Sequence, residues 1–274
     1  MPKTPNSAAA RFLRKPGSKT RLASIDPAST PGIDKLRAEA ELARNREELE
    51  KLQYRLWAQN TQALLVVLQG MDTSGKDGVV RQVVTGMNPE GSRVTSFKKP
   101  SEVELDHDFL WRIHSACPAR GEVAVFNRSH YEDVLIVRVH ALVPKEVWRP
   151  RYEIINGFER TLVGDGTTIV KIFLHISKDE QKRRLIERLE DPEKNWKFNP
   201  GDVEERKHWD EYQEAYEDVI SRCGTPEAPW HVVPADHKWY RNWAVSEILL
   251  HAMREMAPKP PRGRFKVKDF KFDE

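Results

Sequence analysis

The residues best suited to chemistry form the glycine-rich stretch GMDTSGKDG at positions 70–78, which follows the apolar run LLVVL at 64–68. A buried strand that leads into such a turn and then a helix gathers backbone N–H groups around an anion, and Lys76 adds a positive charge. The alternative, a chance glycine turn after a core strand, fits this context less well. We therefore predict a phosphate-binding loop made of Gly70, Met71, Asp72, Thr73, Ser74, Gly75, Lys76, Asp77 and Gly78.

This predicted loop carries two carboxylates in unusual places. A Ser or Thr normally follows the loop lysine and binds magnesium through its hydroxyl, but here that residue is Asp77. Asp72 lies within the loop, where a negative charge repels the phosphates that such loops bind. The motif alone gives no role to Asp77.

A second polar motif, NRSHYED at 127–133, follows the apolar strand VAVF. In phosphoryl-transfer enzymes of this architecture the strand ends in an Asp that holds magnesium, whereas this chain has Asn127. An amide oxygen is a weaker ligand than a carboxylate, so we expect Mg²⁺, with Mn²⁺ as a substitute, to be held first by Asp72 and next by Glu132 or Asp133. Arg128 is expected to bridge phosphates. The alternative is that Glu132 and Asp133 are ordinary acids at a helix start.

The segment 178–209 is dense in basic residues, and we predict that it forms a lid at about 180–208. Arg184 and Arg188 are four residues apart and share a helical face, with Arg183 beside it. Lys194 and Lys197 flank a tryptophan further on. Arginines brought in by a closing segment stabilise the charge of a phosphoryl-transfer transition state. The alternative is a solvated helix whose acids neutralise the same arginines.

Other cations carry less specific signals. Lys98 and Lys99 follow the second predicted strand at the expected ligand-binding edge, and Arg112 lies on the next helix. Lys238 and Arg241 follow the fifth strand at the same edge, but the nearby tryptophans are expected to pack the last helix.

Apolar runs alternate with helical segments, which predicts an α/β fold with a mainly parallel, about five-stranded sheet covered by helices on both faces. We expect the strands at 64–68, 93–97, 123–126, 168–176 and 231–234. We expect helices near 33–62, 77–87, 102–116, 144–163, 178–190, 202–222 and 238–256. Motifs that follow the strands then meet at one crevice.

The composition of the 274 residues indicates a globular cytoplasmic protein that does not enter a membrane. Two distant cysteines indicate neither a disulfide framework nor a zinc site. Residues 1–25 contain six basic and no acidic residues, typical of an arm for an anionic partner or of a solubilising tail. We expect a basic N-terminal arm at 1–32, a kinase domain at 33–258 and a polar tail at 259–274.

With these motifs in place, the chain resembles the family-2 polyphosphate kinases from about residue 33 onward. The resemblance rests on GMDTSGKDG (70–78), FKKPSEVELDHDFLWRIH (97–114), FNRSHYEDV (126–134) and RRLIERLEDPEKNWKF (183–198), with Asp202, Trp209 and Tyr212. The stretch KPGSKTRLASIDP (15–27) is similar to the entry segment of these enzymes.

The resemblance implies a phosphate-loop kinase fold, a three-layer α/β/α sandwich with a helical lid, and magnesium-dependent phosphate transfer between polyphosphate and nucleotides. Asn127, where the family commonly has Asp, looks like the branch that accepts both AMP and ADP. Guanine nucleotides are further candidate acceptors, and the amphipathic helix at 33–62 offers an interface for an expected homo-oligomer. Carried over residue by residue, the catalytic set is Asp72, Lys76, Asn127, Arg128, Arg183, Arg184 and Arg188.

Polyphosphate is a polyanion, so a row of cations is expected to bind it, formed by Lys98, Lys99, Arg112, Lys194 and Lys197. In the expected mechanism the loop holds the acceptor's terminal phosphate near magnesium on Asp72, while the lid presents the end of polyphosphate for in-line attack. The alternatives are an ATP-dependent nucleoside or nucleotide kinase and a non-catalytic binder of nucleotide or RNA. No nucleic-acid-binding signature supports the latter.

Overall fold

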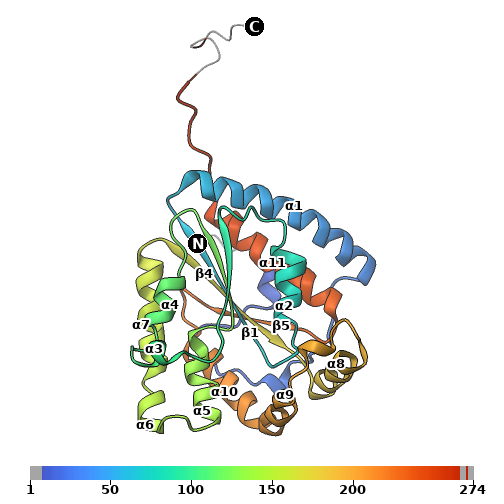
Figure 1. The fold of residues 1–274 in the computed structure, drawn as a ribbon. Coiled ribbons are helices and arrows are strands. Elements are labelled where there is room, and N and C mark those ends of the chain that lie inside the picture. The colour runs from blue at the N-terminus through green and yellow to red at the C-terminus, as the bar shows by residue number, and fades with distance from the viewer. Residues whose placement is uncertain (1–7, 266–269, 271–274) are drawn as a thin grey trace.

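The computed structural model describes residues 8–265 and 270 of the chain, and its centre is a sheet of five parallel strands in the order β2-β3-β1-β4-β5 (Figure 1). The strands are β1 (Ala63–Gln69), β2 (Ser92–Ser96), β3 (Val123–Asn127), β4 (Thr167–His175) and β5 (Trp230–Pro234). All five predicted strands are confirmed to within one residue at each end. The order reverses direction at β1, so the switch point of the sheet lies at the strand that carries the glycine-rich motif.

Helices cover both faces of the sheet (Figure 1). The long ones are α1 (Lys35–Gln59), α7 (Arg151–Gly164), α8 (Lys178–Glu190), α10 (Trp209–Arg222) and α11 (Lys238–Met256). The short ones are α2 (Lys76–Val79), α3 (Glu102–Leu105), α4 (Trp111–Ala116), α5 (Ile136–Val139), α6 (Lys145–Trp148) and α9 (Gly201–Glu205). Short 3₁₀ turns are η1 (Ala8–Arg11), η2 (Leu22–Ser24), η4 (His130–Val134), η5 (Asn195–Lys197) and η6 (Arg206–His208), and a π-helical turn, η3 (Val80–Val84), continues α2.

Three predicted continuous helices are wrong because the chain breaks each of them. The segment 144–163 divides into α6 and α7 at Pro150, which has no N–H to continue a helix and precedes the first residue of α7. The segment 102–116 divides where Asp108 caps the backbone N–H of Leu110 at 2.9 Å. The segment 202–222 divides at the η6 turn between α9 and α10.

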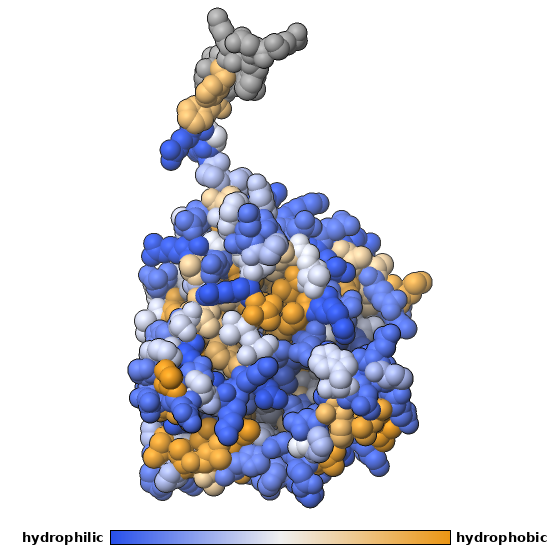
Figure 2. Space-filling model, in the orientation of Figure 1, coloured by the Kyte–Doolittle hydropathy of each residue, from blue (hydrophilic) through white to orange (hydrophobic). Residues whose placement is uncertain are grey.

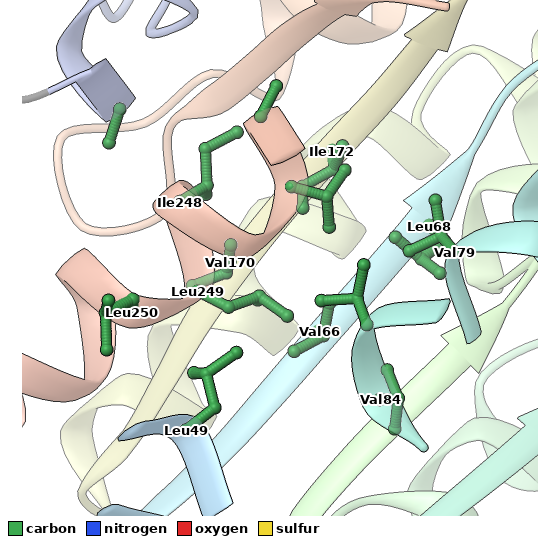
Figure 3. Close-up of a cluster of buried hydrophobic side chains, with 14 of the residues drawn as sticks. Leu49, Val66, Leu68, Val79, Val84, Val170, Ile172, Ile248, Leu249 and Leu250 are labelled. Carbon is green, nitrogen blue, oxygen red and sulfur yellow. The ribbon is translucent and has the colours of Figure 1, made fainter. Parts of the chain in front are cut away.

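Two cores form because neighbouring residues of a buried strand point to opposite faces. Leu64, Val66 and Leu68 of β1 pack with α1, α2 and α11, and the close-up in Figure 3 shows Val66 beside Leu249 of α11 and Leu68 beside Val79 of α2. Leu65 and Val67 face the second core, which α4, α7 and α10 complete. Burial on both faces therefore gives β1 its unbroken apolar sequence.

The N-terminal residues described, from 8 onward, lie against the domain rather than apart from it. Ala9, Phe12 and Leu22 are buried, and residues 12–14 pair with the edge strand β5 through the N–H of Arg14 and the C=O of Trp230 at 2.8 Å. This segment covers the otherwise open edge of the sheet. Residues 1–7 and most of the expected C-terminal tail lie outside the described residues.

The surface seen in Figure 2 is mostly hydrophilic, with a hydrophobic patch over the region of α5 and α6. Leu142, between these two helices, and Val147 of α6 are both exposed. Across residues 8–265, none of the helices is both long enough and apolar enough to span a membrane.

A buried ionic network joins β4 to α7 and to the turn after β3. Lys171, which is 0% exposed, donates to Glu159 Oε2 at 2.6 Å, to the Tyr131 hydroxyl at 2.9 Å and to the carbonyl of Cys223 at 2.6 Å. The second oxygen of Glu159 accepts from the Tyr131 hydroxyl at 2.7 Å and contacts His130 Nε2 at 3.3 Å. Burial lowers the pKa of His130, which favours neutral imidazole. The network fixes the motif that contains Asn127 and Arg128.

Lys171→Met is expected to destabilise the protein strongly, because it leaves the Glu159 carboxylate buried without its cation. The cost is about 3–5 kcal/mol, and chemical denaturation measures it. Lys171→Met combined with Glu159→Gln is expected to recover part of the loss. The control Lys207→Met, which removes an exposed lysine paired with Glu204, is expected to change stability by less than about 1 kcal/mol. Near-native stability of Lys171→Met contradicts the role of the network.

Candidate active site

A cavity of about 980 Å³ lies at the carboxyl edge of the sheet, where the glycine-rich loop meets α8 and the start of α11. Basic side chains outnumber acidic ones on its walls. The basic residues are Lys76, Arg81, Lys98, Arg128, Arg184, Arg188, Lys194, Lys197, Lys238 and Arg241. The acidic residues are Asp72, Asp77, Glu187, Glu190, Asp191 and Asp202. The excess of positive charge suits a ligand with several negative charges.

The loop between β1 and α2 has the backbone that a phosphate-binding turn needs. Gly70 has φ 153°, and a Cβ there would lie 2.8 Å from the carbonyl oxygen of Leu174 and 2.6 Å from Ser74 Oγ, so only glycine fits. Gly75 has φ 100° and directly precedes α2. Met71, Asp72, Thr73 and Ser74 form the turn, with Met71 and Ser74 buried, and Lys76, Asp77 and Gly78 lie in the first turn of α2.

Lys76 folds back onto the loop. Its Nζ donates to the carbonyl oxygens of Gly70 at 2.6 Å and Met71 at 3.3 Å, and the residue is only 9% exposed. Burial lowers the pKa of Lys76, while the charge of Asp72 opposes that shift. The ammonium is therefore held at the cavity wall by neutral acceptors.

Asp72 is compensated inside the loop by Arg128. Their side chains form an ion pair at 2.8 Å between Arg128 Nη2 and Asp72 Oδ1. Arg128 has φ 63°, and its N–H donates to the carbonyl of Leu68 at 3.2 Å, which aims the side chain across the switch point. The repulsion that Asp72 exerts on phosphates is thus offset by a guanidinium that follows the neighbouring strand.

Asp77, which the sequence left without a role, accepts a hydrogen bond from Asn127 Nδ2 at 2.7 Å. The usual pair at these two positions is a hydroxyl on the helix and a carboxylate on the strand. Here the carboxylate is on the helix and the neutral amide is on the strand. One negative charge therefore remains between the two positions.

The three acids proposed for magnesium separate into two groups. Asp72 and Glu132 both line a second cavity of about 220 Å³ that adjoins the first, and burial raises the pKa of Glu132 against the opposing charge of Arg128. Asp133 lines neither cavity and instead pairs with Arg151 at 3.0 Å. Burial raises the pKa of Asp133 to about 6.

Within the described part of the chain, no three His, Cys, Asp or Glu residues are grouped to enclose a metal ion. Mg²⁺ does not need such a cage, because it keeps several waters and takes one or two carboxylates together with substrate phosphates. Asp72 and Glu132, on one cavity wall, fit that mode of binding. The magnesium site stays a prediction.

The predicted lid segment begins as α8 and is tied to the loop by its first turns. Gln181 Nε2 donates to the carbonyl of Asp72 at 3.1 Å. Arg184 donates to the carbonyls of Thr73 at 2.9 Å and Ala235 at 2.6 Å, and it pairs with Glu180 at 2.7 Å. The base of the segment is therefore a fixed wall of the cavity.

The three lid arginines differ in their surroundings. Arg188 lines the cavity and pairs with Asp202 at 3.0 Å. Arg183 does not line the cavity and is held on the exposed side of α8 by Glu180 and Glu187. Lys194 and Lys197, further along the segment, reach the cavity wall. The outer part of the lid thus brings cations to the site.

Among the other predicted cations, Lys98 lines the cavity and Lys99 does not. Arg112 donates to the carbonyl of Lys98 at 2.9 Å and lies over the ring of Phe97, so it supports the turn after β2 rather than reaching the cavity. Sequence reasoning missed Arg81 and undervalued Lys238 and Arg241. Their position could have identified them, because each lies within one or two turns of the start of a helix that follows a strand, at the edge of the sheet where ligands bind.

Asn127→Asp is expected to lower stability by roughly 1 kcal/mol in buffer without divalent cations, because it replaces the amide donor beside Asp77 with a second carboxylate. The cost is modest since Asp77 is exposed. The double variant Asn127→Asp/Asp77→Asn again has one amide and one carboxylate at these positions. Its free energy of unfolding, measured by urea denaturation, is expected to return most of the way to the wild-type value. An exchange that recovers nothing contradicts the pairing.

Comparison with known proteins places these features in one family. Residues 32–261 match the family model described as Polyphosphate kinase 2 (PPK2). The chain is 52% identical over 254 residues to an AMP/ADP-polyphosphate phosphotransferase of Meiothermus ruber, which covers 92% of this chain and 95% of that protein. It is 47% identical over 227 residues to an ADP-polyphosphate phosphotransferase of Rhodopseudomonas palustris, covering 78% of each chain.

Solved structures share the fold. The crystal structure of Polyphosphate Kinase 2 from Arthrobacter aurescens TC1 superposes with a TM-score of 0.93 at 46% identity, and the match covers 96% of this chain and 95% of that one. The resemblance inferred from GMDTSGKDG and FNRSHYEDV is therefore confirmed.

Proposed function

The chain belongs to the polyphosphate kinase 2 family, and on that premise we propose that it transfers the terminal phosphate of inorganic polyphosphate to ADP and AMP, reversibly and with Mg²⁺. The observation that carries the proposal is the strongly basic cavity around the phosphate loop. A relative that is 52% identical over nearly its whole length has both AMP and ADP in its name, which supports both acceptors.

Polyphosphate, as donor, is assigned to the larger cavity. A flexible polyanion needs several cations spaced along a channel, and Lys98, Arg188, Lys194 and Lys197 line this cavity from two sides of the loop. Its volume of about 980 Å³ leaves room for several phosphate units. Arg183, from the predicted catalytic set, does not line the cavity, and neither do Lys99 and Arg112, from the predicted polyphosphate-binding set. These three residues therefore have the least support for direct contact with substrate.

The nucleotide, as acceptor, is assigned to the second cavity, with its terminal phosphate at the loop. Gly70, Met71 and Asp72 of the loop line that cavity, and Tyr212 and Tyr216 add aromatic surface suited to a nucleoside. The two cavities meet at the Asp72–Arg128 pair. An acceptor and a donor in these positions bring their phosphates together beside Lys76.

The reaction needs little covalent chemistry from the protein. The acceptor phosphate is already anionic, so no strong general base is required and the residues act by positioning and charge neutralisation. Lys76 exchanges its carbonyl acceptors for phosphate oxygens, and Arg128 spans the two phosphates from its place beside Asp72. Magnesium, held by Asp72 and Glu132, would supply further neutralisation of the phosphate oxygens.

We extend the proposal to the setting of the enzyme. The cysteines, Cys117 and Cys223, are both free thiols, which supports a cytoplasmic location. The exposed apolar residues Tyr54 and Trp57 on α1 support an assembly of identical subunits. Guanine nucleotides remain proposed acceptors alongside AMP and ADP.

An end-point assay tests the function. Purified protein is incubated with polyphosphate, Mg²⁺ and each of AMP, ADP, GMP and GDP, and products are separated by chromatography. New diphosphate or triphosphate with no other phosphate source is expected. A Lys76→Met preparation controls for contaminating kinases. If phosphate is transferred from ATP but not from polyphosphate, the protein is a nucleotide kinase. If nucleotide binds and no phosphate is transferred from either donor, the protein is a non-catalytic binder.

Asp72→Asn is expected to lower kcat by about 100-fold or more, because it removes the proposed metal carboxylate and the partner of Arg128 at the reacting phosphates. Stability is expected to change by less than about 1 kcal/mol, since the pair is partly exposed. The matched control is Asp165→Asn, a highly exposed aspartate away from both cavities. Wild-type kcat for Asp72→Asn at saturating Mg²⁺ rules out this role.

A further inference from the structure

Arg241, in the first turn of α11, is a buried cation that opens onto the larger cavity. The residue is only 3% exposed, yet it lines the cavity next to Gly75 and Gly78 of the phosphate loop. The established features of the loop do not require it, since backbone N–H groups and Lys76 already define a phosphate site.

The hydrogen-bond partners of Arg241 are neutral. Its Nη1 donates to the carbonyl of Ser74 at 3.3 Å, and its Nε and Nη2 donate to Asn242 Oδ1 at 3.1 and 2.8 Å. No carboxylate of residues 8–265 forms an ion pair with it. The charged groups that act on its pKa are Arg184 and Arg81, which are also cations.

Arg184 and Arg138, two other arginines that are at least partly buried, have the counter-charge that Arg241 lacks. Arg184 pairs with Glu180 at 2.7 Å, and Arg138 pairs with Asp218 at 2.6 Å. An unpaired buried charge is costly, so it is retained where something else supplies the opposite charge. Burial and the neighbouring arginines lower the pKa of Arg241 to about 9, which agrees with that cost.

The loop is shaped around this guanidinium. A Cβ on Gly75 would collide with Nη1 of Arg241, and a Cβ on Gly78 would lie 2.7 Å from Nη2. Gly78 lies within α2 and has no positive φ, so its backbone does not need glycine. Because Gly78 has no side chain, the guanidinium of Arg241 can lie close to the backbone of the phosphate loop.

We infer that Arg241 is a phosphate-binding residue whose missing counter-ion is a phosphate group of the polyphosphate chain. The planar guanidinium of arginine suits phosphate oxygens, and this one already lies at the wall of the cavity assigned to the donor. The inference rests on the proposed function for the identity of the anion.

A physical consequence separates this role from a structural one. A structural arginine stabilises the ligand-free protein, whereas an uncompensated one destabilises it until the anion binds. Binding of the anion then contributes stability in proportion to its affinity and concentration. Removing the charge of Arg241 should therefore weaken anion binding without weakening the ligand-free fold.

The test measures thermal unfolding of the full chain with and without inorganic tripolyphosphate, at several salt concentrations and with no nucleotide, so that no transfer occurs. Arg241→Gln removes the charge but keeps an amide donor near Ser74 and Asn242. Its ligand-free Tm is expected to equal or exceed that of the wild type. Its affinity for tripolyphosphate is expected to fall about 10- to 100-fold, with the salt slope reduced by about 1. Arg241→Lys, which keeps a charge, should recover part of the affinity.

The matched control is Arg138→Gln, which removes a partly buried arginine that has its carboxylate partner and lies off both cavities. It is expected to lower the ligand-free Tm and to leave tripolyphosphate affinity and salt slope unchanged. If Arg241→Gln behaves like this control, the inference is overturned. It is also overturned if tripolyphosphate does not stabilise the wild type.

The nucleotide assay keeps the inference distinct from the proposed function. Normal ATP formation with an unchanged KM for polyphosphate in Arg241→Gln leaves the function intact and removes the role of Arg241. Loss of tripolyphosphate affinity in Arg241→Gln, together with a wild type that makes no ATP, sustains the anion site and removes the proposed function.

Discussion

The electrostatic cost of gathering many cations at one edge of a sheet is the constraint that shapes this protein. Lys76, Arg128, Arg184, Arg188 and Arg241 all line one cavity, and like charges at such distances repel one another. Acids on neighbouring elements pair with Arg128, Arg184 and Arg188, whereas Lys76 and Arg241 donate to neutral carbonyl and amide oxygens. Through these contacts Arg184 of the lid and Arg241 of the last helix both hold the phosphate loop.

Two arrangements keep this charged edge rigid. Arg184 joins α8 to the phosphate loop and to the end of β5, so the base of the lid cannot move without breaking several hydrogen bonds. Behind the edge, the pair Lys171–Glu159 holds Tyr131 and thus the motif that carries Asn127 and Arg128. Movement that admits substrates is accordingly expected in the outer lid, beyond α8, where side chains are mostly exposed.

The hydrogen bond between Asp77 and Asn127 joins two positions at which the usual residue types are exchanged in this chain. A carboxylate and a neutral polar group occupy the two positions in either arrangement, and only their order differs. The total charge beside the loop stays the same. A motif match that requires a hydroxyl after Lys76 therefore misses this loop, in which Asp77 pairs with a residue 50 positions further on.

The sequence by itself determined the five strands, the phosphate loop and the family, because these depend on local patterns: apolar runs, glycines at fixed spacing and motifs that follow strand ends. It also located most cavity residues, since parallel strands bring their following turns to one edge. Breaks within helices such as 144–163 were harder to foresee, because one proline or one cap decides them. Only the tertiary structure decided which cations have partners. Arg183 and Arg184 are adjacent, yet one lies on the exposed face of α8 and the other contacts residues more than 100 positions away in the chain. Ion pairs form across such separations, and no local pattern records them.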